Sequence, residues 1–153
     1  MKSSLNEWER ILFVWGYARL TSNSNWRILN AMSSAKITLG KHGERLAAHH
    51  LMTRGYTILN TNWRCQLGEI DIIAQYDQIL VFVEVRTRHA PTPDMAFESI
   101  TRRKQDKLAT LAETYLNQHE LENQSWRIDV IAIAVLPNGK TIIEHAEDAL
   151  GWT

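Results

Sequence analysis

The sequence predicts an α/β domain in which a mixed central sheet is flanked by helices. Short runs rich in Ile, Val and Phe, which are typical of buried strands, alternate with longer stretches whose apolar residues recur at helical spacing. From about residue 39 the elements follow the order helix, strand, hairpin, helix, strand, and a short last strand follows. This alternation is typical of an α/β fold. The chain has 153 residues, 44% of them hydrophobic, which is enough for one domain with a substantial core.

Residues that favour caps and turns mark the ends of these elements. Gly55 can end the first helix, because glycine readily adopts the left-handed conformation found there. Pro91 and Pro93 exclude a central strand before the second helix, and the segment 137–140 predicts a turn. The expected helices span residues 39–54 and 95–118, and the expected strands span residues 57–63, 68–74, 80–86, 126–136 and 141–144.

Residues 1–36 are expected to form a helical appendage, and residues 37–153 the α/β domain. Leucines and tryptophans at positions 5, 8, 12 and 15 follow the spacing of an amphipathic helix, and the polar segment 21–25 is typical of a linker. The apolar run 11–18 is too short to cross a bilayer and lacks the basic flank of a signal peptide. We therefore expect a cytoplasmic protein without a membrane partner, and the apolar stripe is compatible with a homodimer.

The charge balance is neutral, with 17 basic and 17 acidic residues, so the net charge does not indicate a nucleic-acid partner. A local basic cluster does indicate one, and its candidate nucleic-acid-binding residues are Arg88, Arg102, Arg103 and Lys107. The single cysteine excludes an internal disulfide and a cysteine zinc site, in keeping with the cytoplasm.

Asp71 and Glu84 each place a charge in a strand that is otherwise strongly apolar. Such a charge is costly unless it is paired or binds a metal. A turn at Tyr76–Asp77 would join the two strands into an antiparallel hairpin, with Asp71, Glu84 and Arg86 on one face. Asp71 and Glu84 would then be diagonal neighbours, about 7–8 Å apart at the backbone, and could share one cation. The alternative is a structural network of carboxylates and arginine.

Two helical residues are expected to point inward, toward the sheet. Glu44 has helical spacing to the apolar residues of the first helix, which predicts a third inward carboxylate. Its alternative is a surface glutamate that pairs with a neighbouring basic residue. Lys104 lies four residues from both Ile100 and Leu108, on the apolar stripe of the second helix. Its alternative is a lysine whose stem covers apolar surface while its ammonium reaches water.

This ordered set of residues resembles the PD-(D/E)xK nuclease superfamily, and within it the YraN-like family of small bacterial proteins. The resemblance covers residues 39–144 and leaves out residues 1–38. It rests on the motifs Gly43-Glu44-x-x-Ala47, Gly55-Tyr56, Gly68-Glu69-Ile70-Asp71, Val81-Phe82-Val83-Glu84-Val85, Lys104 and Arg127-Ile128-Asp129-Val130.

The resemblance implies a restriction-endonuclease-like core and a metal-dependent endonuclease that hydrolyses phosphodiester bonds in DNA, including branched or repair intermediates. Asp71 and Glu84 would hold a divalent cation, usually Mg²⁺, with Mn²⁺ as a substitute, and Glu44 would complete the site. A hard ion of this kind takes oxygen ligands, polarises the phosphate and lowers the pKa of the attacking water.

Arg86 departs from the superfamily pattern, which has lysine at this position. Arginine stays protonated in proteins, so Arg86 cannot act as a general base. We expect Arg86 and Lys104 to stabilise charge instead. The departure keeps open an alternative function, a catalytically inactive nucleic-acid-binding module on a nuclease fold. An assembly factor that docks a partner through Trp8 and Trp15 is less favoured, because it leaves the inward carboxylates unexplained.

Overall fold

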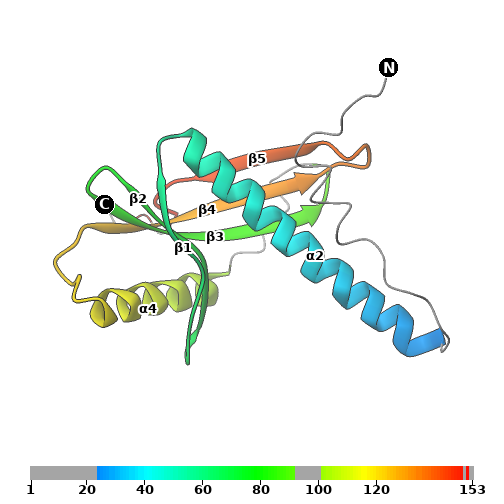
Figure 1. Ribbon diagram of the computed structural model, residues 1–153, viewed down its shortest axis with the longest axis horizontal. Helices are drawn as coiled ribbons and strands as arrows, with labels where there is room; N and C mark the ends of the chain where they lie inside the picture. The colour runs from blue at the N-terminus through cyan, green and yellow to red at the C-terminus, as the bar shows by residue number, and fades with distance from the viewer. Residues whose placement is uncertain (1–23, 92–100, 150, 152–153) are drawn as a thin grey trace, which may run out of the picture. The chain divides into compact units, whose positions relative to one another are not determined.

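A sheet of five strands, covered by a helix on each face, forms the centre of the structure (Figure 1). The structure is a computed structural model that describes residues 24–91, 101–149 and 151. Contacts divide the chain into two compact units, residues 1–33 and 34–153, and the sheet lies within the second. The elements are α2 (Ser24–Thr53), β1 (Thr57–Cys65), β2 (Gly68–Tyr76), β3 (Ile79–His89), α4 (Arg102–Gln118), β4 (Trp126–Val135) and β5 (Thr141–Ala146).

The strands lie in the sheet in the order in which they follow one another in the sequence. The pairs β1–β2, β2–β3 and β4–β5 are antiparallel, whereas β3 and β4 are parallel. A parallel pair requires a crossover, and α4 lies in the connection between β3 and β4. The predicted α/β class with a mixed sheet is therefore confirmed.

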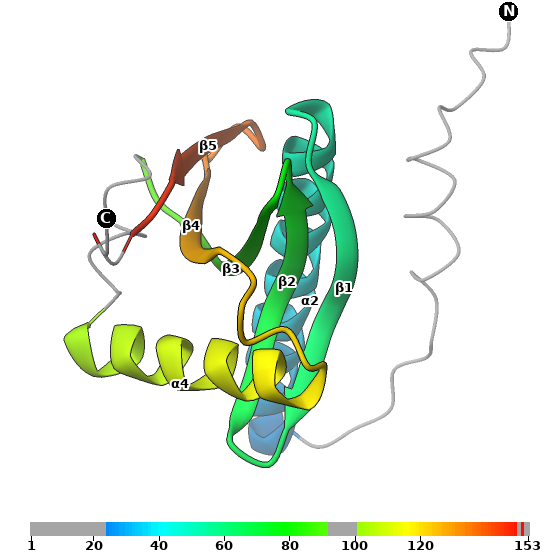
Figure 2. The same ribbon diagram turned by 90° about the vertical axis from the view of Figure 1, so that its left-hand side faces the viewer.

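Two apolar layers hold the helices on opposite faces of the sheet (Figure 2). Alternation along the strands sends neighbouring side chains to different layers, so that Ile72 lies in one and Ile73 in the other. The layer under α2 contains Ala47, Leu51, Ile72, Val81, Val83, Ile131 and Ile133, and the layer under α4 contains Ile73, Phe82, Leu108, Leu111, Tyr115 and Ile128.

The first helix begins earlier than predicted, at Ser24 rather than near residue 39. Ser24 and Asn25, which the sequence assigned to a linker, are helical. Serine and asparagine favour both turns and the first positions of a helix, so their presence did not distinguish the two. The end of the helix was predicted well. Gly55 has φ +90°, its amide donates to the Met52 carbonyl, and the Tyr56 amide donates to the Leu51 carbonyl, which is a Schellman cap.

The β2–β3 turn lies one residue further along the chain than predicted. Tyr76 pairs with Ile79, so the turn residues are Asp77 and Gln78, and Asp77 takes the positive φ of 51°. Asparagine and aspartate tolerate this conformation better than tyrosine does. Because both ends of the turn move by one residue, Asp71 and Glu84 keep their predicted shared face. The predicted diagonal placement is wrong, since the observed register continues to Asp71 opposite Glu84.

The second helix begins at Arg102, because Thr101 has the extended backbone of an N-cap, with φ −75° and ψ 156°. A continuous helix over residues 95–118 is therefore wrong at Thr101. The part of that prediction on residues 95–100 lies outside the described residues, as do the amphipathic helix around residues 5–15 and the linker residues 21–23. Among the helices that the structure describes, none has the length and apolar character needed to cross a membrane.

Candidate functional site

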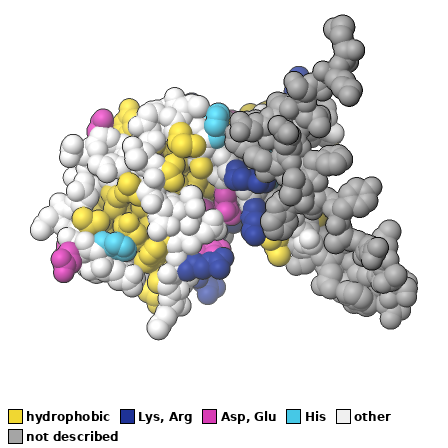
Figure 3. Space-filling model, viewed as in Figure 1, with side chains coloured by type: hydrophobic (Ala, Val, Ile, Leu, Met, Phe, Trp, Pro, Cys, Tyr) yellow, Lys and Arg dark blue, Asp and Glu magenta, His cyan; other side chains and the backbone are white. Residues whose placement is uncertain are grey.

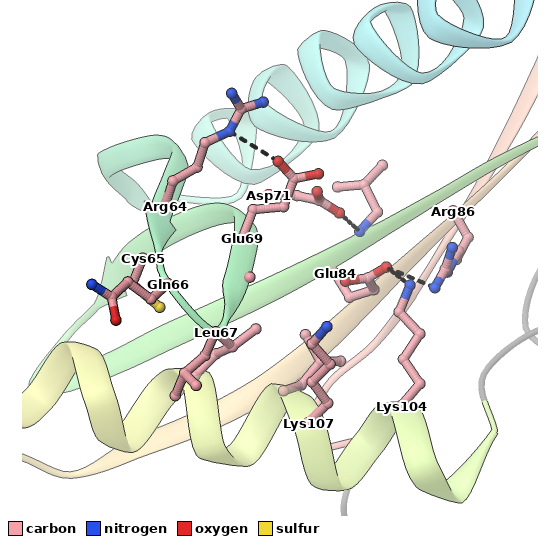
Figure 4. Close-up of a pocket in the computed structure, with 14 residues that line it drawn as sticks. Arg64, Cys65, Gln66, Leu67, Glu69, Asp71, Glu84, Arg86, Lys104 and Lys107 are labelled. Atoms are coloured by element: carbon pink, nitrogen blue, oxygen red, sulfur yellow. Dashed lines mark hydrogen bonds and ion pairs between the residues drawn. The ribbon is translucent and has the colours of Figure 1, made fainter. Parts of the chain in front are cut away.

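A pocket of about 610 Å³ opens between the β1–β2 hairpin, β3 and α4 (Figure 4). On the face shown in Figure 3, basic side chains lie beside acidic side chains in one area. Within the described part of the chain, the charged residues that line the pocket are Arg64, Glu69, Asp71, Glu84, Arg86, Lys104 and Lys107. Basic residues outnumber carboxylates in this set, so the lining is suited to an anion even though it contains acidic groups.

Glu84 lies on β3 and is only 6% exposed. Its Oε1 accepts Lys104 Nζ at 2.6 Å and Arg86 Nη2 at 2.9 Å. Burial raises the pKa of the Glu84 carboxyl, and the charge of Arg86 opposes this effect. The two cations therefore stabilise a carboxylate in an almost fully buried position. The inward orientation of Lys104 is confirmed by its contact with Glu84.

Asp71 lies where β2 and β3 separate. The paired stretch of the two strands runs from Tyr76↔Ile79 to Ile72↔Val83, and Asp71 is the next residue of β2. Its Oδ2 accepts a hydrogen bond from the Val85 amide at 2.8 Å. Burial and the charge of Glu84 raise the pKa of Asp71 to about 7. The predicted carboxylate pair is thus brought into one pocket.

Several polar atoms of the pocket residues have no partner among the described residues. Among the described residues, no hydrogen bond or ion pair reaches Asp71 Oδ1 or Glu84 Oε2. The buried Nε of Arg86 also has no hydrogen-bond partner there. An unpaired buried donor is costly, so an acceptor atom beside Arg86 would be favoured. The pocket can therefore receive a cation at its carboxylates and an oxygen-rich anion at its cations.

Glu44 is not part of this pocket lining. It is half-buried on α2, and its Oε2 accepts a hydrogen bond from Asn62 Nδ2 at 2.8 Å. Its charge still contributes to the raised pKa of Asp71. No group of three or more His, Cys, Asp or Glu residues suited to a metal ion occurs in the described part of the chain. The structure therefore brings together Asp71 and Glu84, while Glu44 as a third ligand stays a prediction.

The four predicted nucleic-acid-binding residues are placed differently. Lys107 lines the pocket, whereas Arg88, Arg102 and Arg103 are exposed outside the lining set. Arg102 and Arg103 are the first two residues of α4 and come just before Lys104. The three exposed arginines can therefore contact only a ligand that extends beyond the pocket.

The β1–β2 hairpin contributes pocket residues that the sequence analysis did not select. Arg64 and Glu69 pair across the hairpin at 3.0 Å, and Leu67 lies in its turn. The sequence did contain one signal that Leu67 is exposed. A leucine in a short turn before a glycine cannot reach the core.

A second polar cluster has a structural role. Asp129 is fully buried, and its carboxylate accepts hydrogen bonds from Arg127, His145 and the Asp148 amide. Burial alone would raise the pKa of Asp129, but the bonds from His145 and Arg127 hold it below its ordinary value. Arg127 also donates to the Tyr56 hydroxyl at 2.8 Å. The motif Arg127-Ile128-Asp129-Val130 therefore ties β4 to β5 and to the end of α2 rather than lining the pocket.

Fold and pocket together define a small α/β domain with a pair of carboxylates, one buried and one half-buried, in a pocket lined by basic residues. The family model described as uncharacterised protein family UPF0102 matches residues 43–133, a range that contains Glu44, Asp71, Glu84, Arg86 and Lys104. The chain belongs to this family, the YraN family, so the family resemblance seen in the sequence is confirmed.

Curated relatives support the same assignment. A UPF0102 protein of Roseiflexus castenholzii is 50% identical over 116 residues, which cover 74% of this chain and 94% of the relative. A UPF0102 protein of Chloroflexus aurantiacus is 45% identical over 121 residues, 78% of this chain and 98% of the relative. A UPF0102 protein of Desulfitobacterium hafniense is 44% identical over 103 residues, 67% of this chain and 85% of the relative.

Proposed function

We propose that this protein is a metal-dependent nuclease that hydrolyses phosphodiester bonds in DNA, on a restriction-endonuclease-like fold. One observation carries the proposal: Asp71 and Glu84 share a pocket with Arg86, Lys104 and Lys107. A carboxylate pair beside cations is suited to hold both a divalent ion and the phosphate on which it acts. In this proposal the DNA includes branched or repair intermediates.

The donor set of the pocket fits magnesium, with manganese as a substitute. Asp71 Oδ1 and Glu84 Oε2 are carboxylate oxygens, the ligand type that hard divalent ions prefer. The raised pKa of Asp71 reflects burial and repulsion from Glu84, and a bound cation would relieve both. Glu44 could assist only if it exchanged its bond with Asn62 for the ion.

The basic residues of the pocket have different roles in the proposed reaction. The ion supplies Lewis acidity and activates the attacking water when it is bound. Lys104 and Arg86 fix the position of Glu84 through its Oε1. The guanidinium of Arg86 and the ammonium of Lys107 can donate to phosphate oxygens and so stabilise the negative charge of the transition state.

The test is cleavage of single-stranded, duplex and branched DNA in Mg²⁺ and in Mn²⁺. Asp71→Ala and Glu84→Ala should each abolish metal-dependent cleavage. Asp106→Asn is the matched control, because Asp106 is an exposed carboxylate on α4 outside the pocket lining. Undiminished cleavage by Glu84→Ala would reject this site.

A second candidate function is a nucleic-acid-binding module without catalysis. Two observations favour it: Lys104 and Arg86 already neutralise Glu84, and no three-ligand group occurs in the described residues. Salt-sensitive DNA binding without cleavage in either metal would select this function. Cytoplasmic location and homodimer formation stay predictions that accompany either function.

A further inference from the structure

The pocket has an apolar end that phosphate chemistry alone does not use. Leu67, Leu108 and Leu111 are among the lining residues, and Leu111 lies beside the turn that holds Leu67. Leu108 and Leu111 are buried residues of α4, whereas Leu67 is 53% exposed. Figure 4 shows Leu67 above one part of α4, while Lys104 lies further along the same helix, beside Glu84 of β3. The pocket therefore combines a charged end with an apolar end.

The position of Leu67 is set by the packing of the hairpin turn on α4. Cys65 pairs with Gly68, so Gln66–Leu67 form the turn. Gly68 has φ +150°, and a Cβ at this position would lie 3.2 Å from Lys107 Cε and 3.5 Å from Leu111 Cδ1. The turn thus rests directly on α4, and its exposed leucine is held at the rim of the pocket.

Lys107 supplies a cation between the two ends (Figure 4). The other basic residues of the lining are paired, Arg64 with Glu69 and both Arg86 and Lys104 with Glu84. Within the described residues, no ion pair is formed by Lys107. An unpaired ammonium beside apolar surface is suited to one phosphate group of a ligand that also has an apolar part.

The size of the pocket also exceeds what a single ion needs. Its volume of about 610 Å³ lies in the range of about 300–1,000 Å³ that is typical of small-molecule sites. A nucleotide has the matching chemistry, because its phosphate is anionic and its base has apolar faces.

We propose that the pocket binds an unpaired nucleotide of a DNA strand, with its phosphate at Lys107 and its base against Leu67. The proposal rests on the proposed function and adds a substrate class, DNA with an unpaired nucleotide at or beside the scissile phosphate. In an intact duplex the bases are stacked inside the helix, and a base reaches a protein wall only after it is extruded. Extrusion costs least for a base that is already unpaired.

The experiment measures binding in EDTA, so that cleavage does not contribute. Fluorescence anisotropy of the full chain is compared on a single strand, a blunt duplex and a duplex with one central unpaired nucleotide, all of matched sequence. The wild type should bind the single strand and the bulged duplex about tenfold more tightly than the blunt duplex. Leu67→Ser should weaken these two complexes by roughly five- to tenfold and leave blunt-duplex binding unchanged.

Three further variants separate base contact from phosphate contact. Leu67→Trp should tighten binding to unpaired DNA, because aromatic faces stack on bases. Lys107→Gln should weaken all three complexes alike and reduce their salt dependence. Leu59→Ser is the control, because Leu59 is 46% exposed on β1 but outside the pocket lining.

Equal wild-type affinity for all three DNAs, or unchanged binding by Leu67→Ser, would overturn the inference. If Leu67→Ser left binding unchanged while Asp71→Ala abolished cleavage, the proposed nuclease would be supported and the proposed contact of Leu67 with the base would be rejected. Selective binding that depends on Leu67, without cleavage in either metal, would support the inference and reject the nuclease. Absence of binding to every DNA would overturn the inference, and the nuclease would then be decided by the cleavage assay in Mg²⁺ and Mn²⁺.

Discussion

Lys104 Nζ lies 2.6 Å from Glu84 Oε1, so a lysine of α4 contacts a carboxylate of β3 inside the pocket. Arg86, two residues after Glu84 on the same strand, contacts the same oxygen at 2.9 Å. This arrangement places a second cation, from a neighbouring element, beside Arg86 on the same carboxylate oxygen.

The contact between Lys104 and Glu84 predicts a specific effect of Lys104→Met, which removes the ammonium and keeps an apolar stem. We expect cleavage by the proposed nuclease to fall by about 100-fold, because Glu84 loses one of the two cations that fix its position. Mn²⁺ binding should become tighter, because Glu84 Oε1 loses a competing cation. Single-turnover cleavage and calorimetric titration measure the two effects, and Lys104→Arg is the control that retains the charge. Wild-type cleavage by Lys104→Met would show that the lysine is structural only.

The raised pKa of Asp71 predicts a pH-dependent gain in stability from Asp71→Asn. The pKa is about 7 in the folded protein and about 3.9 in an unfolded chain. Between these values the folded state binds more protons than the unfolded state, so wild-type stability falls as the pH rises through this window. Asparagine does not titrate and can still accept the bond from Val85. Melting temperatures without metal should be similar near pH 4 and higher for the variant at pH 8. A constant difference across this range would contradict the assigned pKa.

Burial of Asp129 predicts that Asp129→Ala is strongly destabilising, by about 3–5 kcal/mol in urea unfolding, because Arg127 would lose its buried partner. Glu147→Ala is the matched control, since Glu147 pairs with the same arginine at 3.0 Å but its side chain is 53% exposed. It should cost at most about 1 kcal/mol. The pKa of Asp129 is lowered, so its contribution should be present above about pH 4, the ordinary aspartate value, and decline as the pH falls below it. Equal losses in the two variants would exclude a special role for the buried carboxylate.

The close approach of α2 to β3 predicts that Gly43→Ala is destabilising. A Cβ at Gly43 would lie 1.7 Å from Thr87 Oγ1, so the helix or the strand must move. We expect a loss of about 1–3 kcal/mol in urea unfolding, typical of overpacking. Gly40→Ala on the same helix is the control, because no atom lies within 4 Å of its Cβ position. It should stabilise the protein by about 0.5–1 kcal/mol. If both substitutions had the same sign, the contact with Thr87 would not be the cause.

Much of the fold followed from local patterns. Gly55 ends α2 as predicted, because its conformation depends mainly on its own lack of a Cβ. The shared face of Asp71 and Glu84 was also predictable, since side chains alternate along any strand. The turn between them was placed one residue too early. Tyr76 pairs with Ile79 and stacks on Tyr56, with ring centroids 4.5 Å apart, and that contact with a distant segment was not visible in the hairpin sequence.

The candidate site was predictable in part. Asp71, Glu84, Arg86 and Lys104 meet in one pocket. Asp71, Glu84 and Lys104 had been selected because their charges interrupted apolar patterns, and Arg86 had been selected from the family resemblance. Glu44 was selected by the same reasoning, yet it bonds to Asn62 and lies outside the pocket lining. A helical pattern determines which way a side chain faces but not how far it lies from a strand of the sheet.

By itself, the sequence determined the α/β class, the order of the elements along the chain and the face on which the carboxylates lie, because propensity and alternation act over a few residues. Only the tertiary structure decided that Lys104 contacts Glu84, that Leu67 lies at the rim of the same pocket and that Asp129 is fully buried. These relationships depend on how closely α4, the β1–β2 hairpin and β5 pack against the central strands. Such distances are set by side-chain volumes from distant parts of the chain, which no local pattern contains.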